Sequence, residues 1–150
     1  MRLTGFFRPG DQAPYITATV IQGHLGIVGE VRFLVDSGAS STILSDLDVQ
    51  RLGIDISRLV QSPEEMIGVG GVTKALLFPD VKLFFLTSGA TFETDMEKIY
   101  VLRYSGTESA QKAMTRKIPS LLGRDFLNKY TVVLNYGDNL VLITDESIAI

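Results

Sequence analysis

Residues 33–45 read FLVDSGASSTILS, an apolar run that leads directly into an acid. A carboxylate at the end of a buried strand is costly to remove from water unless it finds partners, so Asp36 needs an explanation. It either caps a turn, by accepting backbone N–H bonds from Gly38 or Ala39, or it takes part in chemistry. The apolar context would bury the carboxylate while leaving its oxygens near backbone donors. We therefore expect Asp36 to be a candidate acid or base.

Outward from this stretch, alternating apolar and polar residues predict a mostly antiparallel, all-β domain. Glycines at positions 23, 26 and 29 separate the first two strands and favour a hairpin, and the sequence GDN at 137–139 is a tight turn between the last two. We expect one domain over residues 1–150. The predicted strands cover residues 15–22, 27–36, 65–69, 72–86, 91–104, 131–136 and 140–144.

Two short helices interrupt the strands. Ser45 and Asp48 fit the N-cap and N3 positions of a capping box, and Gly53 provides a C-terminal stop. The second helix is expected over residues 124–129. Residues 105–117 are polar and predict a surface loop.

Composition excludes several classes of protein. The net charge of −3 argues against a nucleic-acid surface, and no segment approaches the roughly 18 apolar residues needed to span a bilayer. With no cysteine and His24 as the single histidine, we expect no metal site and no cofactor. The lack of cysteine suits a reducing compartment, so we expect a cytoplasmic protein.

Two further stretches carry glycines where they could matter. Residues 66–78, MIGVGGVTKALLF, predict a mobile hairpin; a phosphate-binding loop is less favoured, because no Lys-Ser/Thr and no helix follow the glycines. Residues 118–136 contain an apolar strand that ends at Gly123, a short helix and an alternating strand. Gly123 would let two backbones approach closely.

Taken together, the motifs LVDSGA (34–39), IGVGG (67–71) and LLGRDFL (121–127) resemble those of the retropepsin-like aspartic proteases, in the order of that family. The resemblance implies a closed, mostly antiparallel barrel with a flap hairpin. It also implies a homodimer that cleaves a peptide or protein substrate. Asp36 would be the catalytic residue of each subunit.

The resemblance assigns roles to other residues as well. It implies that Ser37, Gly38 and Ala39 support the active-site loop. It places structural support at Gly123, Arg124 and Asp125, and substrate binding at Gly38, Ser40, Gly68, Val69, Gly70 and Gly71.

The sequence departs from the retroviral members at two places. Ser40 stands where they commonly carry an Asp that pairs with the Arg of the late motif, so we expect Arg124 to find another carboxylate or carbonyl partner. The chain also continues beyond the strand at which retroviral chains end, which leaves the geometry of a dimer interface open. A retropepsin-like barrel that binds peptides or dimerises without hydrolysis is the alternative function.

Overall fold

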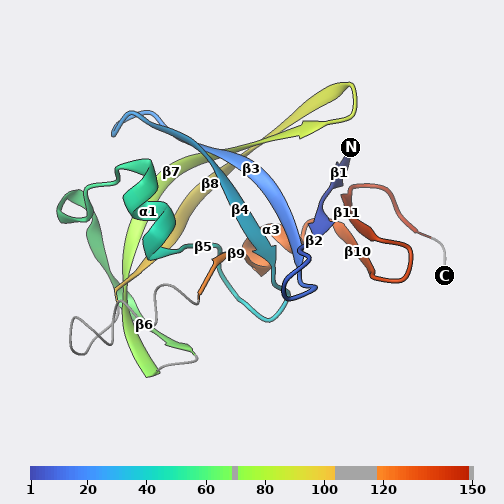
Figure 1. Cartoon of the computed structure of the whole chain (residues 1–150). Coiled ribbons are helices and arrows are strands. Elements are labelled where there is room, and N and C mark those ends of the chain that lie inside the picture. Colours follow the sequence, from blue (N-terminus) through green and yellow to red (C-terminus); the bar gives the residue numbers. More distant parts are fainter. Residues whose placement is uncertain (69–70, 104–117, 149–150) are drawn as a thin grey trace.

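The computed structural model describes residues 1–68, 71–103 and 118–148. The chain consists mainly of strands, and short helices lie between some of them (Figure 1). The strands are β1 Arg2–Thr4, β2 Phe6–Phe7, β3 Pro14–Gln22, β4 Ile27–Val35, β5 Ile43–Leu44, β6 Val60–Gly68, β7 Gly71–Thr87, β8 Ala90–Arg103, β9 Ser120–Leu122, β10 Thr131–Asn135 and β11 Leu140–Thr144. The helices are α1 Asp46–Leu52, η1 Ile56–Arg58 and α3 Arg124–Leu127.

Six strands close into a barrel. The larger sheet has the order β2-β3-β4-β9-β5-β8-β7-β6, and an additional pairing of β3 with β7 joins its two sides. Val20 lies opposite Leu83 at this closing pair. The β4–β9 and β5–β8 pairs are parallel and the others are antiparallel. The structure thus has the closed, mostly antiparallel barrel that the sequence predicted.

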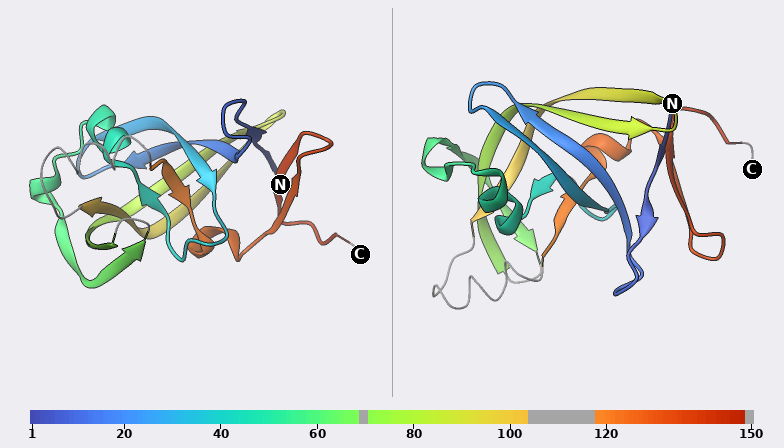
Figure 2. Two further views of the ribbon diagram at one scale, coloured as in Figure 1. Left: turned by 60° about the horizontal axis from the view of Figure 1, so that its bottom comes forward. Right: turned by 45° about the horizontal axis from the view of Figure 1, so that its top comes forward.

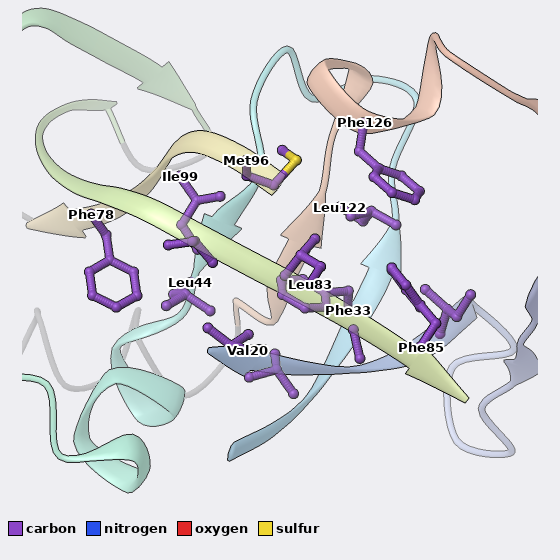
Figure 3. Packing of buried hydrophobic residues seen from close by; sticks show 14 of the residues in the cluster. Val20, Phe33, Leu44, Phe78, Leu83, Phe85, Met96, Ile99, Leu122 and Phe126 are labelled. Atoms are coloured by element: carbon purple, nitrogen blue, oxygen red, sulfur yellow. The ribbon is translucent and has the colours of Figure 1, made fainter. Parts of the chain in front are cut away.

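Alternate residues of the barrel strands point inward and form the hydrophobic core. Phe33 of β4 and Phe85 of β7 are almost fully buried, and Phe126 of α3 lies 5.5 Å from Phe85 between ring centroids. Figure 3 shows these side chains converging between the strands. Helix α3 therefore closes the core at the side from which the Asp36 loop leaves β4.

Helix α1 begins and ends as its sequence predicted. The Ser45 side chain accepts a hydrogen bond from the Asp48 N–H, and Gly53 ends the helix with φ 72°, in the left-handed region that favours glycine. The Asp48 carboxylate in turn accepts a 2.6 Å bond from the Ser120 hydroxyl of β9. Among the described residues, none of the helices has the length and apolar character required to cross a bilayer.

The two ends of the chain form a separate three-stranded sheet in the order β1-β11-β10. The Met1 ammonium lies 2.7 Å from Asp145 and lowers the pKa of that carboxyl, chiefly by donating it a hydrogen bond. Figures 1 and 2 show this small sheet at the end of the molecule opposite α1 and the β6–β7 hairpin.

Some predicted boundaries were wrong. Strand β6 begins at Val60 instead of residue 65, because an edge strand tolerates Pro63 in its path. Helix α3 ends at Leu127 instead of residue 129. The predicted loop at residues 105–117 lies outside the described residues, as do Val69 and Gly70. Strands β1, β2 and β5 were not predicted.

Candidate active site

Asp36 follows the last residue of β4 and continues the β4–β9 ladder, because its N–H donates to the Leu122 carbonyl at 3.1 Å. Its carboxylate Oδ1 accepts a 2.9 Å bond from the Gly38 N–H, and its carbonyl accepts a 3.2 Å bond from the Ala39 N–H. The chain therefore turns sharply at Asp36. The carboxylate is fixed against the backbone of the turn it starts.

The expected burial of this carboxylate is only partial in a single chain. Asp36 and Ala39 are half-buried, whereas Ser37, Gly38 and Ser40 are exposed. Alternate residues of β4, namely Val31, Phe33 and Val35, are buried, and the chain emerges at the surface after Val35. A side chain added at Gly38 would place its Cβ 3.1 Å from Asp36 Oδ1, a tight contact. The loop thus presents an oriented carboxylate on an accessible face.

The loop after Asp36 is hydrogen-bonded to the first turn of α3. The Arg124 N–H donates to the Ala39 carbonyl at 2.8 Å, and the Asp125 N–H donates to the Ser40 carbonyl at 3.2 Å. These N–H groups have no partner within the helix, so the loop carbonyls satisfy them. The Arg124 guanidinium also donates to the Ser37 carbonyl at 2.9 Å, which supplies the carbonyl partner that the sequence left unnamed.

Asp125 secures the far end of the loop. Its carboxylate accepts bonds from the Thr42 N–H at 2.9 Å and from the Thr42 hydroxyl at 2.7 Å. The same hydroxyl accepts a 3.2 Å bond from the Gly123 N–H. Thr42 is fully buried and was not predicted as part of the site. The local signal for it was the run of three hydroxyl residues, Ser40 to Thr42, directly before the apolar pair of β5.

Gly123 lies where the two segments touch. A Cβ at this position would lie 2.5 Å from the carbonyl carbon and oxygen of Ser41 and 2.9 Å from its nitrogen. The close approach of two backbones that was expected at Gly123 is therefore present, and its neighbour is the Asp36 loop. Residues 123–125 and 36–42 form one hydrogen-bonded unit, called here the loop–helix unit.

The loop–helix unit leads to a prediction for Asp125. Replacing Asp125 by Ala leaves the buried N–H and hydroxyl of Thr42 without their partner, so the free energy of unfolding should fall by about 1.5–3 kcal/mol, the usual range for hydrogen bonds to a charged group. Urea denaturation at a fixed chain concentration measures this loss. Asp95→Ala, which truncates an exposed acid of β8, is the matched control and should change stability little. Equal effects of the two variants would contradict the assigned contact.

The β6–β7 hairpin carries the residues that were expected to form the flap. Gly68 ends β6 and pairs with Gly71, which begins β7. In Figure 1 the segment after β4, in cyan, lies between this hairpin and the small terminal sheet. Two of the four residues expected at the flap tip, Gly68 and Gly71, are thus adjacent across a strand pair.

A cavity of about 240 Å³ is lined by residues of β8, by Ser41 and by residues of α3 and the segment after it. Ser41 and Asp125 contribute to its wall, but Asp36 does not. In the described ranges no three or more His, Asp or Glu side chains are grouped so that they could hold a metal ion. The accessible face of Asp36 is therefore the candidate reaction site.

Comparison with known proteins points to one family. A family model described as aspartyl protease matches residues 17–126. The crystal structure of a retropepsin-like aspartic protease from Rickettsia conorii is similar to the chain, with a TM-score of 0.53 and 20% sequence identity, over 95% of this chain and 89% of that chain. EIAV protease in complex with the inhibitor HBY-793 gives a TM-score of 0.46 and 18% identity, over 81% of this chain and 90% of that chain. A search of curated protein sequences found no match. The first likeness shows the retropepsin-like fold.

Proposed function

The chain belongs to the aspartyl protease family, whose model it matches over residues 17–126, and we propose that it is an endopeptidase that uses two Asp36 carboxylates, one from each subunit of a homodimer. The observation that carries the proposal is the position of Asp36. It directly follows Val35, the buried last residue of β4, is oriented by the Gly38 N–H and is reachable from solvent. It also belongs to the single Asp-Ser/Thr-Gly motif of the sequence.

Two such carboxylates placed side by side resist simultaneous ionisation, because like charges repel at short distance. One stays protonated and one is charged, and the proton belongs to the pair. The charged member takes a proton from a bound water, whose oxygen forms a bond to the carbonyl carbon of the substrate. The protonated member hydrogen-bonds the carbonyl oxygen. When the tetrahedral intermediate collapses, the C–N bond breaks and the departing nitrogen takes up a proton, which yields an acid and an amine.

The surrounding residues would position an extended peptide. The exposed Gly38 and Ser40 offer backbone groups beside Asp36, and the β6–β7 hairpin, whose last described pair is Gly68 and Gly71, would cover the substrate from the other side. Main-chain hydrogen bonds of this kind bind a peptide as an added strand. The Ser37 carbonyl is held by Arg124, so the loop keeps its shape while substrate enters. The absence of cysteine supports a cytoplasmic location.

A peptide-library cleavage assay tests the proposal. We expect the wild-type protein to cleave extended peptides and Asp36→Asn to lose about 10²- to 10⁴-fold in rate, the usual contribution of a general acid–base group. Asp55→Asn is a matched control, because Asp55 Oδ1 also accepts a bond from the N–H two residues later, at 3.0 Å. It should cleave as the wild type does. A wild-type protein without activity would leave the non-catalytic peptide-binding module, whereas an Asp36→Asn variant that cleaves as fast as the wild type would show that Asp36 is not the catalytic residue.

A further inference from the structure

Strand β8 is paired along only one of its edges for most of its length. Strand β7 pairs with it between Ala90 and Arg103. On the other edge, the short strand β5 pairs only with Tyr100 and Val101. In the part of the chain that the structure describes, no strand pairs with residues 90–98 on this second edge. These residues therefore form an open strand edge.

The backbone groups that face this open edge can be identified. The Tyr100 N–H donates to the Thr42 carbonyl, just before β5, at 3.0 Å. Successive residues of a strand direct their N–H and C=O groups to opposite edges, so Met96 and Thr94 direct theirs to the same edge as Tyr100. A segment laid along this edge would continue the line of β5 backward beyond Ser41.

The cavity of about 240 Å³ lies along this open edge. Four consecutive residues of β8, from Asp95 to Lys98, line it. Because successive side chains of a strand point to opposite faces, a hollow on one face would be lined by alternate residues only. Ser41 and Tyr100 line the end at which β5 begins. The volume is below the roughly 300–1,000 Å³ of pockets for drug-sized ligands, and it suits a short chain segment.

The charges around the cavity differ between the two faces of the sheet. Asp95 and Glu97 are exposed on the outer face of β8, whereas the side chain of Met96, between them, is buried in the core. Lys129 follows α3, which packs through Phe126 against the core, so it approaches the cavity from the inner side. Within the described ranges, none of these three charged groups has a hydrogen-bond or ion-pair partner.

Two further charged side chains line the cavity, and both are engaged within the chain. The Asp125 carboxylate accepts the bonds from Thr42, and Lys98 Nζ lies 5.7 Å from the centroid of the Tyr100 ring. The free charges are therefore two carboxylates on the outer face and one ammonium on the inner side. Two carboxylates on a strand edge deter pairing with the same strand of a second copy, whose carboxylates would face them.

We propose that the open edge of β8 is a second peptide-binding site, separate from the proposed cleavage at Asp36, and that it takes a short extended segment with alternating basic and acidic side chains. The backbone of the segment pairs with the free groups of β8 as an added strand. Basic side chains on the outer face meet Asp95 and Glu97. The acidic side chain between them points to the inner side and meets Lys129.

Equilibrium binding of a labelled peptide tests the proposal. The probe is the pentapeptide Thr-Lys-Glu-Lys-Thr with blocked ends and a fluorophore, and its anisotropy is followed as the Asp36→Asn chain is added, so that the probe is not consumed. Adding Glu97→Lys to this chain should raise the dissociation constant at least about tenfold, because a repulsive charge replaces an attractive one. Glu30→Lys is the matched control, since it changes an exposed glutamate of β4 by the same charge, and it should leave the constant unchanged.

An undetectable interaction, or equal affinities with and without Glu97→Lys, would overturn the inference. Equal losses in Glu97→Lys and Glu30→Lys would show attraction by net charge alone and would overturn it as well.

Methylation of the probe tests the addition of a strand. One version carries N-methyl groups on both lysine nitrogens, and the other carries them on the nitrogens of the glutamate and the last threonine. An added strand turns alternate N–H groups toward β8, so only one of the two sets is needed for pairing. We expect one version to bind at least about tenfold more weakly than the parent probe and the other to bind as the parent does. Equal affinities of the two versions would rule out strand addition. Both experiments measure binding and not cleavage, so they hold whether or not the wild type is a peptidase.

Discussion

Adding about a ninefold excess of Asp36→Asn chains is expected to lower the cleavage activity of the wild-type protein about tenfold once subunits have exchanged, since random pairing leaves few wild-type dimers. Each mixed dimer keeps a single Asp36, and an asparagine can neither accept the proton of the water nor share one with its neighbour. The measurement is the initial rate of peptide cleavage at constant wild-type concentration. The variant should fold normally, because its side-chain oxygen can still accept the bond from the Gly38 N–H.

The same excess of Asp55→Asn chains is the control. Asp55 forms a similar turn through a 3.0 Å bond from the Ser57 N–H, far from the candidate site in sequence and outside the loop–helix unit. Dimers that contain it should keep their activity. Full activity in the presence of excess Asp36→Asn chains, with subunit exchange shown by co-purification of a tagged copy, would mean that a single Asp36 suffices and that the shared pair is wrong.

The sequence predicted the elements whose signals are local. Residues 15–22 alternate over a full strand, and β3 spans Pro14–Gln22. The helix signals at Ser45 and Gly53 lie within nine residues of one another in the chain, and α1 begins and ends where they indicate. Such patterns depend on one face of one element, and a single sequence contains them.

The contacts that shape the candidate site are non-local, and for this reason the sequence did not predict them. Thr42 and Asp125 are 83 residues apart, and nothing in their immediate neighbours pairs them. Strand β5 has two residues, which is too short for any period, yet it completes the barrel between β9 and β8. The partner of Arg124 is a backbone carbonyl, and every residue offers one. The motif resemblance gave the residues, whereas their connections required the structure.

Gly123 should be the position in the loop–helix unit least able to accept a side chain. Gly123→Ala is expected to lower the free energy of unfolding by about 3 kcal/mol or more. Substitutions that add atoms to a packed site are most destabilising where the neighbouring atoms cannot move away. The obstructing atoms belong to the Ser41 backbone, 2.5 Å from the new Cβ. Moving them would also move the loop that carries Asp36. Cleavage per folded molecule should therefore fall along with stability, which urea denaturation measures.

Two other glycines provide graded controls. A Cβ at Gly29 would lie 2.2 Å from the Leu52 side chain, which can change its rotamer, so Gly29→Ala should cost less than Gly123→Ala. At Gly23 nothing lies within 4 Å of the new Cβ, and Gly23→Ala should be neutral or raise stability by about 0.4–1 kcal/mol by restricting the unfolded chain. Of these three glycines, only Gly123 has backbone atoms against the added carbon, and those atoms belong to the segment that follows Asp36. The same loss of activity per folded molecule in Gly29→Ala would show that general loosening of the barrel, and not displacement of the Asp36 loop, is the cause.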